Sequence, residues 1–158
     1  MAAVRGVALC SAALAVILLA ACGGGGSRLS QDAYGAKLTQ IKQEAASAQA
    51  SVALGLRAKT LAELRGRLDA FAESTQRIGD EVANLKPPQN AEAANTELAD
   101  GLHETARATR DASKQITGLH TPREAISYLE HSPLNKKGAH QVDEALTRLK
   151  QLGYTSGS

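Results

Sequence analysis

The chain has 158 residues, of which 43% are hydrophobic, and its 18 lysines and arginines nearly balance 16 aspartates and glutamates. A net charge of +2, mixed evenly along the sequence, excludes a typical nucleic-acid-binding protein, whose basic residues gather on one face. Three tyrosines, one phenylalanine and no tryptophan favour closely packed helices over a β-sandwich. Both cysteines lie within the first 22 residues, so the rest of the chain has no disulfide framework.

The first 21 residues have the pattern of a secretory signal. Arg5 is the only charged side chain before an uncharged apolar run over residues 6–20. A run of about 15 residues is short for a membrane span, which needs roughly 20. The run ends in Leu19-Ala20-Ala21-Cys22, which is a branched apolar residue and two small residues before a cysteine.

This tetrapeptide resembles the lipobox of bacterial lipoproteins with a type II signal peptide. The resemblance implies that a signal peptidase recognises Leu19, Ala20 and Ala21 and removes residues 1–21, with Cys10 among them. Cys22 would then carry a diacylglycerol, with or without an N-acyl chain such as palmitate, and two acyl chains hold a protein stably on a membrane. No other cofactor is expected. The alternative is an ordinary secretory signal that happens to contain a cysteine.

The implied location is the extracytoplasmic face of a bacterial membrane, which is the cell membrane or, in an organism with two membranes, the outer one. Gly23 to Ser27 form a flexible coil that spans about 12 Å. We therefore expect a lipidated cysteine and tether over residues 22–29, a helical domain over residues 30–153, and a disordered tail over residues 154–158.

Capping signals and apolar spacing predict three long helices and one or two shorter ones. The long helices are expected over about residues 30–55, 60–86 and 90–119, and the second has a heptad seam that Pro87-Pro88 ends. A short helix follows over residues 121–132, and a last one over residues 136–152 has Gly153 as its C′ residue. The expected N-caps are Ser30, Thr60, Asn90 and Thr121.

Short connections between these helices favour an all-α, antiparallel up-and-down bundle, preceded by the signal-peptide helix and the glycine-rich tether. A homodimeric coiled coil is the competing architecture, because the seam alone does not exclude self-association. The last helix is expected to turn Val142, Ala145, Leu146, Leu149 and Leu152 inward. Solvent-facing ion pairs at i,i+4 are expected between Glu63 and Arg67, Glu73 and Arg77, and Glu144 and Arg148.

No residue pattern predicts a catalytic or metal site. The four histidines, His103, His120, His131 and His140, lack the i,i+3 or i,i+4 spacing of helical metal ligands. Asp100 precedes His103 by three residues, and two ligands do not make a site. Carboxylate pairs one turn apart, Asp69 with Glu73 and Asp100 with Glu104, are expected to face solvent, and no Gly-x-Ser-x-Gly turn is present. We therefore expect a protein that is not an enzyme.

Two groups of basic residues are candidate contacts with anionic headgroups or cell-wall polymers. The first contains Arg107, Arg110 and Lys114, and the second contains Lys136, Lys137 and His140. Both groups are also explained by an ordinary solvated helix face, and we favour this interpretation over a contact with headgroups or polymers.

Beyond the lipobox, the chain resembles small uncharacterised helical lipoproteins of high-G+C Gram-positive bacteria. The resemblance rests on the glycine-rich tether, on Leu29-Ser30 with Tyr34, on Pro87-Pro88 before an alanine-rich helix, and on Leu152-Gly153-Tyr154. It implies a cell-envelope lipoprotein with no known enzymatic activity. We therefore expect a lipid-anchored protein of structural or protein-interaction type, with the membrane and an envelope protein as partners. The alternative function is an extracytoplasmic carrier of a lipid or small ligand in a bundle cavity.

Overall fold

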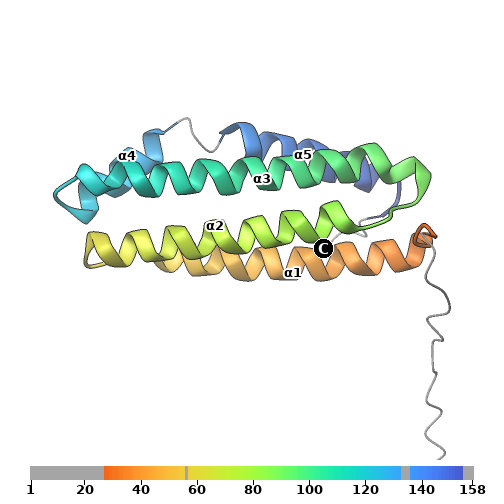
Figure 1. Cartoon of the computed structure of the whole chain (residues 1–158), viewed down its shortest axis with the longest axis horizontal. Helices are drawn as coiled ribbons and strands as arrows, with labels where there is room; N and C mark the ends of the chain where they lie inside the picture. The colour runs from red at the N-terminus through yellow and green to blue at the C-terminus, as the bar shows by residue number, and fades with distance from the viewer. Residues whose placement is uncertain (1–26, 56, 133–135, 155–158) are drawn as a thin grey trace, which may run out of the picture.

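The computed structural model describes residues 27–55, 57–132 and 136–154, and every regular element in them is helical. The long helices are α1 (Gln31–Gly55), α2 (Leu61–Asn84) and α3 (Glu92–Gln115), and the shorter ones are α4 (Pro122–His131) and α5 (Lys136–Gln151). Single 3₁₀ turns, η1 (Gln89–Ala91) and η2 (Ile116–Gly118), flank α3. The expected all-α class is confirmed. The helices lie lengthwise beside one another, with α4 and α5 following the length of α3 (Figure 1).

Three of the four expected N-caps are present. The side-chain oxygens of Ser30, Thr60 and Thr121 accept hydrogen bonds from the main-chain N–H three residues later, at 3.1 to 3.2 Å. The expected cap at Asn90 is wrong, because η1 precedes α3 and Ala91 occupies the cap without a side-chain bond. Asn90 Oδ1 instead accepts a hydrogen bond from the Tyr154 hydroxyl at 2.6 Å.

Helices α2 and α3 form the centre of the bundle. Helix α3 packs against α2 on one side and α5 on the other, whereas α1 packs mainly against α2. Close approach of α5 to α3 depends on two glycines, since a Cβ atom at Gly138 would lie 2.9 Å from the carbonyl oxygen of Gly101 and 2.7 Å from the nitrogen of Thr105. Side chains at these two positions would force the helices apart.

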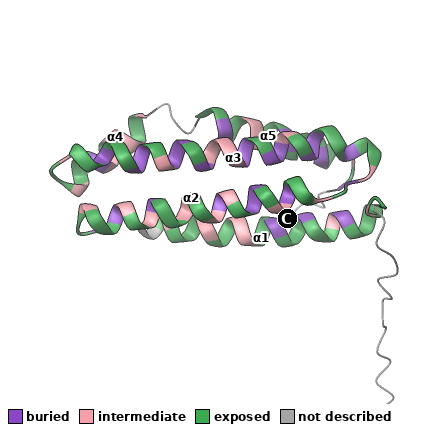
Figure 2. Ribbon diagram, viewed as in Figure 1, coloured by how far each residue is buried: buried purple, intermediate pink, exposed green. Residues whose placement is uncertain are grey.

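The core consists of two separate clusters of buried residues. One end of the bundle, which we call the proximal end, holds Leu29 and the larger cluster, which includes Tyr34, Leu38, Ile78, Leu98, Leu149 and Tyr154. The distal end holds the smaller cluster, formed by Ala58, Leu64, Leu68, Ile116 and Ala125. Buried positions accordingly follow the inner faces of the helices in Figure 2, whereas much of α1 is exposed or half-buried.

The packed domain is longer at both ends than residues 30–153. Leu29 donates its N–H to the carbonyl oxygen of Lys86 at 2.7 Å, and Arg28 forms an ion pair with Glu92 at 2.8 Å. Tyr154, which was expected in the disordered tail, is buried. The remaining expectations for the tether and tail concern residues outside the described ranges or, for Ser27, an exposed residue.

The end of α5 explains why Tyr154 is buried. Gly153 has a φ of +82°, and the N–H groups of Gly153 and Tyr154 donate to the carbonyl oxygens of Lys150 and Leu149. These are the paired hydrogen bonds of a Schellman motif with glycine at C′, as the sequence predicts. The motif turns the chain back so that the Tyr154 ring packs edge-on against Tyr34, with the ring centroids 5.1 Å apart.

Some sequence expectations about side chains are wrong. Leu146 is 40% exposed, whereas the buried residues of α5 are Gly138, Ala145 and Leu149. Of the three expected ion pairs only that between Glu63 and Arg67 forms, at 2.9 Å. Arginine side chains are long enough to reach a neighbouring helix, and the other two pairs are replaced by contacts between helices, Arg77 with Glu44 and Arg148 with Glu97, both at 2.9 Å.

Candidate functional site

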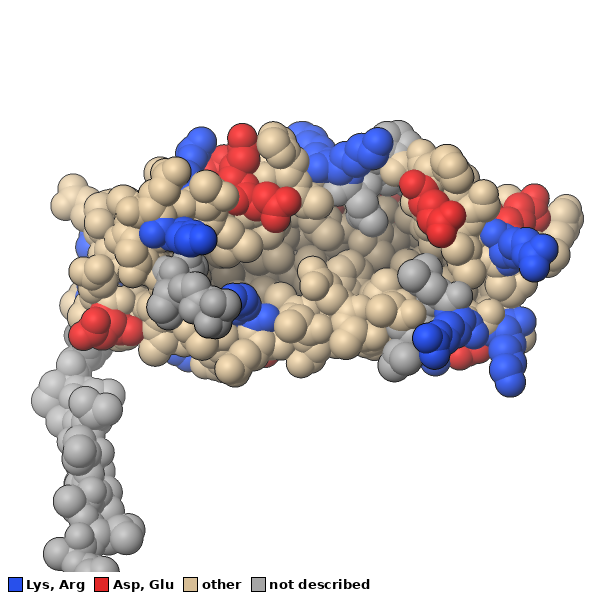
Figure 3. Space-filling view, turned by 180° about the vertical axis from the view of Figure 1, so that it is seen from behind, with Lys and Arg blue, Asp and Glu red and all other residues tan. Residues whose placement is uncertain are grey.

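An apolar hollow lies in one face of the bundle between α1 and α5. Figure 3 shows it as a depression along the middle of the molecule, with few charged side chains inside it. Its volume is about 150 Å³, and we call it the α1–α5 hollow after the two helices that border it. Its walls come from Ala45, Ala48 and Gln49 of α1 and from Ala139, Val142 and Asp143 of α5; its floor comes from Phe71, Thr75, Ile78, Leu102 and Thr105.

The hollow exists because small residues form much of its two walls. Ala45 and Ala48 of α1 and Ala139 of α5 are too short to meet across the space between the helices. Phe71, the only phenylalanine of the chain, is half-buried on the floor and belongs to neither core cluster. A large aromatic side chain that is left partly open to solvent in an apolar depression is a typical feature of a contact site.

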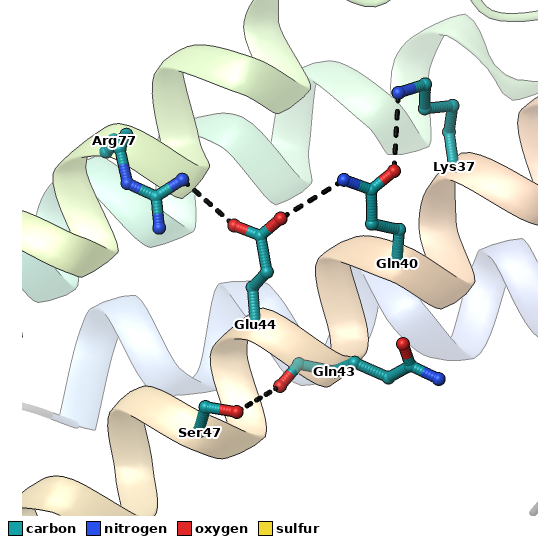
Figure 4. Close-up of polar contacts among 6 residues, drawn as sticks. All are labelled: Lys37, Gln40, Gln43, Glu44, Ser47 and Arg77. Atoms are coloured by element: carbon teal, nitrogen blue, oxygen red, sulfur yellow. Dashed lines mark hydrogen bonds and ion pairs between the residues drawn. The ribbon is translucent and has the colours of Figure 1, made fainter.

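A second, polar depression runs between α1 and α2, and Figure 4 shows its centre. Glu44 of α1 accepts hydrogen bonds from Arg77 of α2 at 2.9 Å and from Gln40 at 3.2 Å, and Lys37 donates to Gln40 at 3.3 Å. The hydrogen bond from Arg77, followed by that from Gln40, holds the pKa of the Glu44 carboxyl below its usual range. The polar groups at this centre are therefore paired with one another, and we assign them to holding α1 against α2.

The histidines of the described residues are not gathered into groups of three with other possible metal ligands. His103 pairs with Asp80 of α2, with 2.9 Å between Nε2 and Oδ1, and not with Asp100 of its own helix. The pair is on the surface and lines neither depression. Within residues 27–55, 57–132 and 136–154, no three histidine, cysteine or acidic side chains are grouped to hold a metal ion.

All three members of the first basic group have polar partners on the bundle. Arg107 pairs with Glu104 at 2.7 Å, Lys114 pairs with Asp111 at 3.3 Å, and Arg110 donates to Gln76 at 3.5 Å. These contacts fit a solvated helix face. Lys136 and Lys137 of the second group are exposed at the start of α5 and have no acidic partner among the described residues.

The expected lipidation site lies outside the described residues. Cys22 and the recognition residues Leu19, Ala20 and Ala21 precede Ser27, the first residue that the structure describes. None of the helices in the described part of the chain is long and apolar enough to cross a membrane. The α1–α5 hollow was not predicted from the sequence, although the half-buried Phe71 lies on the predicted seam of α2.

The chain matches no family model, no curated protein and no solved structure. The features of the chain that bear on its function are therefore the N-terminal motif and the geometry of the bundle.

Proposed function

We propose that the protein is a lipid-anchored lipoprotein of a bacterial cell envelope, in which a tethered helical bundle works through contact with another envelope protein. The observation that carries the anchor is Leu19-Ala20-Ala21-Cys22 at the end of an uncharged apolar run. A diacylglycerol on Cys22 would keep the bundle at the membrane surface, because two acyl chains together bind a bilayer stably.

The geometry of the hollow supports contact with a protein over carriage of a lipid. Pockets that enclose small ligands usually have volumes of about 300 to 1,000 Å³, whereas the α1–α5 hollow has about 150 Å³. A space of this size takes one side chain and does not enclose a whole lipid. The depression between α1 and α2 is larger, at about 480 Å³, but its lining is mainly glutamine, serine and charged side chains, which do not suit an acyl chain.

The anchor is tested by replacing its attachment residue. Cells that express the full chain are grown with radiolabelled palmitate, and the purified protein is assayed for label. We expect the wild-type chain to be labelled and Cys22→Ser to be unlabelled, because serine has no thiol to receive the lipid.

Cys10→Ser is the matched control, since it removes the other cysteine and leaves the lipobox intact. This variant should be labelled like the wild-type chain. Label on Cys22→Ser, or loss of label from Cys10→Ser alone, would overturn the proposed anchor.

A further inference from the structure

We propose that the α1–α5 hollow receives one large apolar side chain from an amphipathic helix of a partner protein, which lies lengthwise between α1 and α5. The inference deepens the proposed function, because it assigns the contact surface and the kind of partner. It depends on the described bundle alone and does not require that Cys22 is lipidated.

The volume of the hollow sets the size of the inserted group. An apolar cavity of about 150 Å³ accommodates a molecule the size of benzene, and the α1–α5 hollow has the same volume. One leucine or phenylalanine side chain fits this space. Phe71 on the floor offers its ring as a packing surface, and a buried apolar anchor of this kind commonly contributes a large part of the binding energy at an interface.

The walls of the hollow favour a helix over an extended segment. Both walls are helices, whose main-chain N–H and C=O groups are bonded within the helix. An extended segment would therefore find no main-chain partners there, whereas a helix satisfies its own main-chain groups. The small side chains of Ala45, Ala48 and Ala139 leave room for a helix to approach closely.

The charged side chains of α5 indicate which charged residues the partner helix should present to it. Lys136 and Lys137 are exposed in the first turn, and Asp143 is exposed about two turns later; none of the three has an ion-pair partner among the described residues. The edge of the hollow shows a basic group and an acidic group next to each other (Figure 3). A complementary helix would place acidic side chains near the two lysines and a basic side chain near Asp143.

Leu146 extends the apolar part of this surface. It follows Val142 by one helical turn and Ala139 by two, so the three residues share one side of α5. Its side chain is the only large hydrophobic one that is exposed in the described part of the chain. A partner helix that inserts a side chain beside Phe71 would therefore cover Leu146 with a second apolar residue.

The experiment places a photo-reactive benzophenone side chain at Gln49, on the α1 edge of the hollow, in the otherwise complete chain. Whole cultures of the organism that makes the protein, cells together with their medium, are irradiated so that the chain is present whether or not it is anchored, and the cross-linked peptide is identified by mass spectrometry. The matched control carries the same group at Ala50, which is exposed on α1 and lines neither depression.

We expect cross-linking from Gln49 to one segment of another protein, with the amphipathic pattern of a helix and a leucine or an aromatic residue near the cross-link. Lys136→Glu together with Lys137→Glu should lower the yield about tenfold, which corresponds to 1.4 kcal/mol, whereas Lys114→Glu on α3 should leave it unchanged. Circular dichroism checks that each variant is folded.

Cross-linking from Gln49 to a second copy of this chain, to a lipid or to an extended segment would overturn the inference. An equal yield from Ala50, an absence of any adduct, or a yield unaffected by the lysine substitutions would also overturn it. Because Cys22→Ser is tested by palmitate labelling, failure of the anchor and failure of the helix contact are distinguished by separate measurements.

Discussion

Tyr34 is the residue at which packing and polar contacts are most closely combined. Its side chain is fully buried, and its hydroxyl donates to Asn95 Oδ1 at 3.0 Å. Asn95 in turn donates through Nδ2 to the carbonyl oxygen of Val82 at 3.0 Å, so this chain of hydrogen bonds joins α1, α3 and α2. Burial, followed by the nearby Tyr154, raises the pKa of the Tyr34 hydroxyl to about 12.

This raised pKa predicts a loss of stability at alkaline pH. The unfolded tyrosine ionises near pH 10, whereas folded Tyr34 keeps its proton up to about pH 12. The stabilising contribution is therefore fully present below pH 10 and is lost as the pH rises to 12, by about 2 to 3 kcal/mol. Chemical denaturation at a series of pH values measures this loss.

Tyr34→Phe is the control for the alkaline loss, because the lysines and the remaining tyrosines still titrate in this variant. Its free energy of unfolding should fall less steeply between pH 10 and 12 than that of the wild-type chain. At pH 7 it should be less stable by about 1 to 3 kcal/mol, since buried Asn95 Oδ1 loses its donor. Parallel pH curves for the two proteins would contradict the assignment.

At the scale of elements, the approach of α5 to α3 is set by glycine. Gly138→Ala adds a Cβ atom that would lie 2.5 to 2.9 Å from Thr105 and from the Gly101 carbonyl, and two of these contacts are with main-chain atoms. We expect α5 to shift and the free energy of unfolding to fall by about 1 to 3 kcal/mol. Urea denaturation followed by circular dichroism measures the change.

Gly66→Ala is the matched substitution in α2. A Cβ atom there meets nothing within 4 Å, so only the helical preference of alanine acts. The variant should be more stable by about 0.5 to 1 kcal/mol. If both substitutions changed stability in the same direction, close packing at Gly138 would not be the cause.

The helices were largely predictable from the sequence because their ends are coded locally. Each threonine cap is formed by residues only three positions apart, Thr60 with Glu63 and Thr121 with Glu124. The turn at Gly153 depends on the conformational freedom of that glycine. The cap at Asn90 was mispredicted because its side chain bonds Tyr154, which is 64 residues away. Leu146 was mispredicted because the side of α5 that packs against α3 is chosen by Gly101 and Gly138.

At the scale of the whole molecule, α1 is the least supported long helix. It packs mainly against α2, whereas α3 packs against both α2 and α5. In its second half the apolar side chains Ala45, Ala48 and Val52 are only half-buried, and two of them are small. Contacts with few large apolar side chains allow a segment to open without unfolding of the rest.

Hydrogen exchange should therefore be fastest, among the three long helices, in the second half of α1, and slowest in the middle of α3. Mass spectrometry of peptides from the exchanging protein measures this order. Uniform protection across α1, α2 and α3 would show that the bundle opens only as one cooperative unit.

The α1–α5 hollow could not be predicted from the sequence for a reason that belongs to this scale. Its walls and floor come from four helices, and the residues that form it range from Ala45 to Asp143. Local spacing assigns Phe71 to an apolar seam, but it does not show that the facing side chains are alanines. Only the arrangement of the helices brings these short side chains opposite one another.

The burial of Tyr154 against Tyr34 has a practical consequence for labelling. It brings the last described residue of the chain to the helix end where α1 begins, so a fluorophore on exposed Gln151, three residues before Tyr154, lies near the proximal end of the bundle. A fluorophore in the turn between α1 and α2 would lie at the other end of α2, a helix of 24 residues and about 36 Å. Energy transfer from these two positions to a dye in the bilayer would report which end of the molecule faces the membrane.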